Sequence, residues 1–215
     1  MRVILSGFLP KATPDPIPRC DVVQSIAVIP HGRVVAMTVR TPDPDPGWLS
    51  ETELATARAR LPMIYVEALP VRLDGYGRVV EVGLLYRADS SGHFRYSFVS
   101  GRVHYMHSIR DTLMNHLEKD LGPLAMPQLP MSLTPFTVAE YFPYASSSGL
   151  TDQRQHAVAL CYVVPVRGDT QPRQDALEVA WLTPEQAMSD EITNEFEGGR
   201  GKLVTQAMAW ANWGF

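Results

Sequence analysis

Residues 156–166 form an almost wholly apolar run. A strand that is apolar along its whole length offers no face to water, so we expect other elements to cover it on both sides. Elsewhere in the chain, segments typical of strands and of helices follow one another without regular βαβ alternation. This order favours an α/β fold with helices on both faces of a mixed sheet over a doubly wound nucleotide-binding fold.

Further strands are predicted on either side of this run. Glycine-bearing turns separate candidates at residues 63–73, 79–87 and 94–99. Two more candidates lie at residues 136–142 and 177–181. No GxGxxG motif follows a strand and no GxxxxGK[ST] motif occurs, so the common dinucleotide and P-loop classes lack their glycine cradles.

A helix is predicted over residues 108–121, with Ser108 as its cap. Apolar residues recur every four positions and form a stripe suited to a core, and Gly122 supplies the stop. Capping patterns predict three more helices: one that opens at Ser50, one that opens at Thr183, and a last one over residues 202–212.

The first 59 residues are interpreted as an N-terminal extension. It comprises a proline-rich arm at 1–21, a hairpin within 22–40, a stiff turn at 41–47 and the helix that opens at Ser50. Residues 60–215 then form one domain, a size that fits a single hydrophobic core.

Composition excludes several classes of protein. The net charge is -4 and no run of Lys or Arg exceeds two residues, so binding of a nucleic-acid polymer is not expected. Two cysteines make neither a disulfide framework nor a four-cysteine zinc site. No apolar stretch reaches the length of a membrane span and no signal peptide is evident, so we expect a cytoplasmic protein without membrane contact.

Residues 101–122 carry a spaced pattern of two glycines, an aliphatic residue and a carboxylate. Gly101 and Gly122 bracket the stretch, Leu117 stands at the aliphatic position and Asp120 at the last acidic one. This spacing resembles the Nudix box, in which a glycine is followed by a loop and a helix that carries three glutamates. The preceding strands, the apolar run and the segment 177–187 also resemble Nudix proteins in order and spacing, over roughly residues 60–213.

Several positions depart from the pattern of the family. His107 stands in place of the first glutamate and Asn115 in place of the arginine. His116 and Lys119 replace two metal-binding glutamates, and Pro123 replaces an aliphatic residue. Positions 116, 119 and 120 share one helix face because their spacing is i, i+3 and i+4. One carboxylate and one imidazole suit Mg²⁺ poorly, and the lysine places a positive charge where a cation would bind.

The resemblance implies a Nudix-like α/β/α sandwich around a mixed β-sheet, preceded by the β/α extension. It also implies hydrolysis of a phosphoanhydride in a nucleoside diphosphate linked to another group, with Mg²⁺ or Mn²⁺ as the cofactor. The ligand is then a small phosphate-bearing molecule.

Three readings of the altered box remain open. In one, the protein is an inactive binding or regulatory module that needs no metal, with Lys119 and the nearby Arg102 supplying positive charge. In the second, it is a hydrolase whose Asp120 is joined by Glu140 or Asp152 from the later strand and loop. In the third, histidines at 104, 107 and 116 perform metal-free acid–base chemistry.

From these readings we predict a set of site residues. Each of them could instead be an ordinary surface or hydrogen-bonded side chain. The catalytic candidates are His116, Asp120 and Glu140, with any metal on Asp120 and His116. The phosphate-binding candidates are Gly101, Arg102, His107, Lys119 and Asp152. The proline-rich arm and the apolar patches further suggest a homodimer.

Overall fold

The computed structural model describes residues 23–28, 34–39, 49–88, 92–172 and 176–212. The chain divides into two compact units, residues 1–46 and residues 47–215. In the first unit, β1 (Val23–Val28) pairs antiparallel with β2 (Val34–Val39), which confirms the predicted hairpin. The arm predicted at 1–21 and the turn predicted at 41–47 lie outside the described residues.

The second unit begins before the domain start that we predicted at residue 60. It includes α1 (Glu51–Arg60), whose predicted capping box is formed between Ser50 and Glu53. The helix is tied to the rest of this unit by the Arg58 side chain, whose Nε donates to Gln155 Oε1 at 3.0 Å. The local sequence pattern does not predict this contact, because the two residues lie far apart in the chain.

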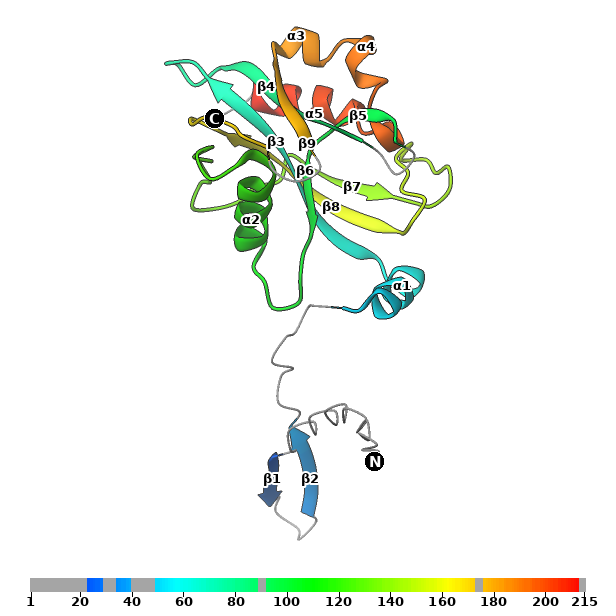
Figure 1. Cartoon of the computed structure of the whole chain (residues 1–215). Coiled ribbons are helices and arrows are strands. Elements are labelled where there is room, and N and C mark those ends of the chain that lie inside the picture. The colour runs from blue at the N-terminus through cyan, green and yellow to red at the C-terminus, as the bar shows by residue number, and fades with distance from the viewer. Residues whose placement is uncertain (1–22, 29–33, 40–48, 89–91, 173–175, 213–215) are drawn as a thin grey trace, which may run out of the picture. The chain divides into compact units, whose positions relative to one another are not determined.

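The sheet of the second unit is built around β3 (Met63–Leu73). This strand runs parallel to β8 (Ala157–Pro165) and antiparallel to β4 (Val79–Ala88), while β7 (Thr137–Tyr141) pairs antiparallel with β8 at the edge. On the other side, β9 (Ala176–Leu182) pairs antiparallel with β4. The sheet is therefore mixed, as predicted (Figure 1).

The strand predicted at 94–99 is in fact two strands with different partners. β5 (Phe94–Ser97) pairs with β4, and β6 (Val99–Arg102) pairs with β3. Phe98 lies between them and is only 2% exposed, so its burial accompanies the change of partner. Gly101, which we expected to begin a loop, lies inside β6 for this reason.

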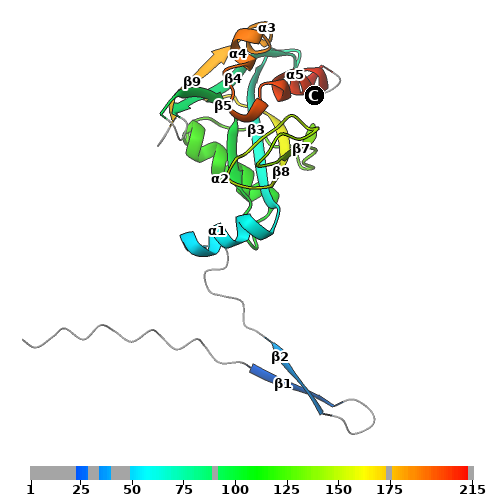
Figure 2. The same ribbon diagram turned by 90° about the vertical axis from the view of Figure 1, so that its right-hand side faces the viewer.

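Alternate residues of β3 and β8 face two separate cores. Val66 and Ala68 pack with Leu113 and Leu117 of α2 (Ile109–Leu121). Leu69 and its neighbours of the same face pack instead with α5 (Lys202–Ala211). The two helices thus cover opposite faces of the sheet, and the apolar run of β8 is covered on both sides as its sequence predicted (Figure 2).

Short helices connect β9 to α5. They are α3 (Pro184–Ala187), α4 (Asp190–Thr193) and the 3-10 turn η1 (Glu197–Gly199). The predicted cap at Thr183 is present, with its side chain accepting from the Gln186 amide. Within the described residues, no helix is long and apolar enough to cross a membrane.

Candidate functional site

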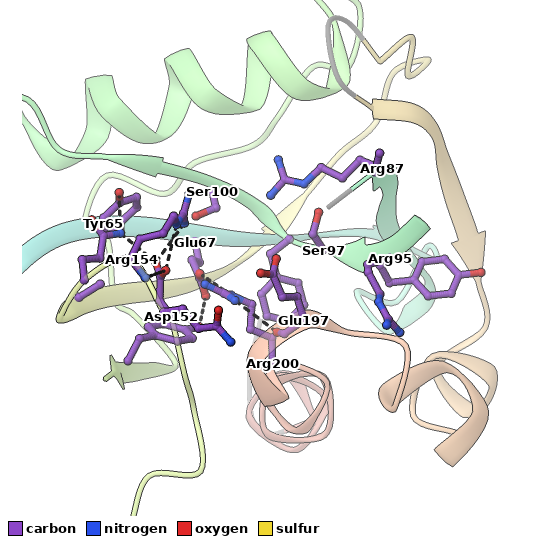
Figure 3. A pocket seen from close by; sticks show the side chains of 17 residues that line it. Tyr65, Glu67, Arg87, Arg95, Ser97, Ser100, Asp152, Arg154, Glu197 and Arg200 are labelled. Atoms are coloured by element: carbon purple, nitrogen blue, oxygen red, sulfur yellow. Dashed lines mark hydrogen bonds and ion pairs between the residues drawn. The ribbon is translucent and has the colours of Figure 1, made fainter. Parts of the chain in front are cut away.

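A pocket of about 400 Å³ opens beside the sheet, on the side of Glu67 and Tyr141 (Figure 3). Strands β3 to β7, the loop before β8 and the turn before α5 all contribute to its wall. Its lining is polar and charged, and comprises Tyr65, Glu67, Arg87, Ala88, Arg95, Tyr96, Ser97, Phe98, Ser100, Tyr141, Asp152, Gln153, Arg154, Gln155, Ala157, Glu197 and Arg200.

Arginines dominate the charge of the pocket. Four of them line it, against three carboxylates, which leaves a formal excess of one positive charge. Guanidinium groups offer planar pairs of donors that match phosphate and carboxylate oxygens. A small anionic ligand is therefore the class of molecule that suits this wall.

The floor of the pocket is a hydrogen-bonded unit centred on Glu67. This carboxylate of β3 is 2% exposed, and it accepts a hydrogen bond from Tyr141 Oη at 2.6 Å and one from Arg200 Nε at 3.3 Å. The Arg200 guanidinium also lies 4.3 Å from the centre of the Tyr141 ring. Burial raises the pKa of Tyr141, and the neighbouring Glu67 charge raises it further, so the phenol stays protonated as a donor.

Asp152 forms part of the wall rather than a free acid. Arg154 donates to its two oxygens at 2.9 and 3.0 Å, and Gln155 Nε2 donates to Oδ2 at 2.9 Å. Burial acts to raise the pKa of Asp152, but the hydrogen bonds and charge of Arg154 outweigh it and lower the pKa. Asp152, which we predicted to bind phosphate, thus holds Arg154 in position at the pocket wall.

On the opposite face of the sheet, the His116 ring of α2 lies directly on Gly101 of β6. A Cβ atom added to Gly101 would stand 1.8 Å from His116 Nε2, so only glycine leaves room for the ring. Burial lowers the pKa of His116, against the opposing effects of a hydrogen bond to the Arg102 backbone and of the Asp120 charge. His116 is therefore neutral at pH 7, and its buried Nδ1 has no hydrogen-bond partner among the described residues.

Asp120 lies one turn further along α2 and is 4% exposed. Its Oδ1 is 3.5 Å from Lys119 Nζ, and its buried Oδ2 has no partner within the described structure. Burial raises the pKa of Asp120, while the positive charges of Lys119 and Arg87 oppose the shift. Arg87 is also a lining residue, so one side chain of the pocket wall carries a charge that acts on Asp120 of the box helix (Figure 3).

The side chains of the box helix do not fit a divalent metal. His116 Nδ1 and Asp120 Oδ2 are two polar atoms without a hydrogen-bond partner among the described residues, but the Lys119 ammonium lies 3.5 Å from the other oxygen of Asp120. Across the described residues, no group of three or more His, Cys, Asp or Glu side chains is placed to hold a metal ion. A catalytic zinc site uses three protein ligands, and Mg²⁺ prefers oxygen ligands, of which this face offers only the Asp120 carboxylate beside an ammonium group.

The other predicted residues lie away from the pocket. Glu140 is exposed on edge strand β7, on the face opposite to its buried neighbour Tyr141. His107 is exposed in the loop before α2, with its ring centre 5.6 Å from that of His104. Arg102 is half-buried at the end of β6 and does not line the pocket. Of the predicted site residues, the structure brings Asp152 to the pocket and groups Gly101, His116, Lys119 and Asp120 around α2.

Several pocket residues were missed by reasoning from the sequence. The acid Glu67 interrupts an apolar strand, and a carboxylate in such a position is rarely buried unless it is paired, so this signal could have identified it. Arg87, Arg95 and Arg200 carry no local signal, because the sheet gathers them from positions far apart in the chain.

Comparisons with known proteins place this geometry in context. A family model described as a domain of unknown function, DUF4916, matches residues 44–213. A solved structure from Jonesia denitrificans DSM 20603, described as a possible asymmetric diadenosine tetraphosphate (Ap4A) hydrolase, is 53% identical in sequence. That match has a TM-score of 0.69 and covers 71% of this chain and 96% of the other. A comparison with curated protein sequences finds no match.

More distant solved structures share the arrangement of strands and helices. The NUDIX domain of Shewanella oneidensis NrtR, solved with ADP ribose, is 15% identical, with a TM-score of 0.53 and coverage of 75% of this chain and 98% of the other. The MutT protein of Methanosarcina mazei Go1 is 15% identical, with a TM-score of 0.50 and coverage of 67% and 92%. At such identities these two likenesses concern the fold alone.

Proposed function

Since the chain belongs to the DUF4916 family and has the Nudix fold, we propose that it hydrolyses a phosphoanhydride in a nucleoside diphosphate-linked substrate. The observation that carries this proposal is the arginine-lined pocket, in which the charge of Arg87 also acts on Asp120 of the box helix. The Jonesia relative, with its description as a possible Ap4A hydrolase, supports a dinucleoside polyphosphate as the first substrate to test.

The arginines would bind the phosphates of this substrate. Arg154 and Arg200 are held at the wall by Asp152 and Glu67, so their guanidinium groups are positioned before the ligand arrives. Ion pairs of this kind lower the cost of ordering side chains on binding. The ring of Tyr96 at the same wall offers a flat apolar surface for a base.

Asp120 is the carboxylate best suited to activate water. Its Oδ2 is free of hydrogen bonds among the described residues, and burial raises its pKa, which makes the ionised form a better base. In the proposed step, Asp120 takes a proton from water, the water oxygen bonds to phosphorus, and the anhydride P–O bond breaks. The leaving phosphate group departs with the electrons of that bond, and the arginines stabilise its negative charge.

Turnover of a substrate panel tests this proposal. We expect phosphorus NMR to detect cleavage of diadenosine tetraphosphate, ADP-ribose or a nucleoside triphosphate, and Asp120→Asn to lower the rate by at least about 100-fold. Glu118→Gln is the matched control, because Glu118 is exposed on the same helix and should leave the rate unchanged. Adding Glu140→Gln to the Asp120→Asn variant tests the predicted catalytic role of Glu140.

A second candidate function is a ligand-binding or regulatory module without catalysis. The observation that favours it is the donor set of α2, in which Lys119 and His116 replace two carboxylates. Absence of turnover of every panel member, with and without divalent ions, together with measurable ligand binding, would decide in favour of this module.

A further inference from the structure

Asp120 and its two cationic neighbours form a charged site beside α2, and of these three residues Arg87 also lines the pocket. The carboxylate is 4% exposed, so little water compensates its charge. Lys119 Nζ lies 3.5 Å from Oδ1, and the charge of Arg87 also acts on this carboxylate. Two positive charges around one negative charge leave the site with a net positive charge.

Arg87 belongs both to the surroundings of Asp120 and to the wall of the pocket. It lies near the end of β4, lines the pocket wall, and extends toward α2 in Figure 3. Within the described residues, no ion pair or hydrogen bond engages its guanidinium. The wall arginines Arg154 and Arg200 differ, because each is already paired with a carboxylate. Arg87 is therefore the pocket cation with the most donors available for an incoming anion.

We propose that Arg87 and Lys119 take the place of divalent cations at this box, so that the protein binds a phosphate group of its ligand without a metal. The inference rests on the proposed function, because the ligand is the same phosphate-bearing molecule. A guanidinium and an ammonium supply positive charge and hydrogen-bond donors to phosphate oxygens, as a hydrated metal would. A divalent ion at the same place would meet two like charges and one carboxylate.

A substitution at Lys119 can restore a set of metal ligands on α2. Lys119→Glu would leave His116, Glu and Asp120 at i, i+3 and i+4 on one helix face, a set of three metal ligands. We expect millimolar Mn²⁺, added without nucleotide, to leave the melting temperature of the wild-type chain unchanged. It should raise that of the Lys119→Glu variant by about 2 °C or more.

A matched variant separates ligand gain from loss of the lysine charge. Lys119→Met removes the ammonium without adding a donor, so Mn²⁺ should not stabilise it. A second variant, His116→Glu with Lys119→Glu, provides three carboxylates should the single change bind too weakly. A Mn²⁺ stabilisation of the wild type that Asp120→Asn abolishes would overturn the inference.

Nucleotide binding distinguishes this inference from the proposed function. By calorimetry, we expect diadenosine tetraphosphate to bind the full chain equally in EDTA and in Mg²⁺. We expect Arg87→Met to weaken binding at least about tenfold in both buffers. Binding that requires Mg²⁺ would overturn the inference and leave the proposed function standing. No binding in either buffer would overturn both.

Discussion

Asp120 is a buried carboxylate, and the burial of its charge lowers the stability of the folded protein at neutral pH. Its carboxylate is buried, and one oxygen has no partner among the described residues. Burial raises its pKa above the ordinary range of an aspartate, so the folded protein binds this proton more tightly than the unfolded chain does. The contribution of Asp120 to stability is thus fully present below the unfolded pKa and is lost as the pH rises through the folded pKa.

Asp120→Asn should therefore stabilise the protein at pH 7. We expect a gain in the free energy of unfolding on the order of 1 kcal/mol, because the variant buries no charge. The gain should shrink as the pH falls toward the pKa of an aspartate in an unfolded chain, about 3.9. Urea unfolding of both proteins at several pH values checks this, and a variant that is less stable at pH 7 would contradict it.

Glu67 differs from Asp120 because its buried charge is paired with that of Arg200, so we expect its removal to destabilise the protein. Glu67→Gln keeps an acceptor for Tyr141 but leaves the Arg200 guanidinium, whose side chain is 17% exposed, without its counter-ion. We expect a loss of about 3 kcal/mol in the free energy of unfolding. The control is Glu81→Gln, which breaks a pair with Arg72 of 35% and 39% exposure and should cost less than about 1 kcal/mol. Similar losses in the two variants would show that the buried Glu67–Arg200 pair contributes no more to stability than the more exposed Glu81–Arg72 pair.

Among the elements, local patterns predicted what depends on local contacts. The four-residue stripe predicted α2 and its buried face, and the apolar run predicted a strand covered on both sides. The split of 94–99 into β5 and β6 was not predicted, because a change of partner strand depends on distant residues. Strand order also separates Glu67 from Glu140: the first is buried on central β3 and the second is exposed on edge strand β7.

The packing of α2 on β6 should depend on the absence of a side chain at Gly101. Gly101→Ala places a methyl group 1.8 Å from His116 Nε2, so we expect a loss of about 1–3 kcal/mol in unfolding free energy. Gly75→Ala is the control, since nothing lies within 4 Å of an added Cβ there. In a double-mutant cycle, His116→Ala should remove most of the penalty of Gly101→Ala. Additive losses would show that the ring does not rest on this glycine.

At the scale of the whole molecule, the second unit contains both described cores. Among the residues whose side chains the structure describes, the buried hydrophobic ones lie between Met63 and Met208, within the unit that begins at Gly47. We therefore expect residues 47–215 to fold without residues 1–46, with a melting temperature within about 3 °C of the full chain. Calorimetry of the two chains checks this, and an unfolded fragment would show that the first unit is required.

The predicted homodimer is a separate property of the whole chain. The reason for it was the proline-rich arm at 1–21 together with apolar patches in the sequence, and it stays a prediction. Light scattering of the full chain at micromolar concentration should give the mass of two chains of 23.9 kDa. A monomer would remove the prediction, and a dimer that the 47–215 fragment cannot form would assign the contact to the first unit.

The arginine pocket is proposed to bind the phosphates of a nucleotide ligand. The most direct measurement is a calorimetric titration of the wild type, Arg200→Met and Arg167→Met with diadenosine tetraphosphate. Arg200 lines the pocket, whereas Arg167 is exposed outside it and serves as the control. We expect Arg200→Met to weaken binding by at least about tenfold and Arg167→Met to leave it unchanged. Equal affinity of all three proteins, or no binding by the folded wild type, would contradict it.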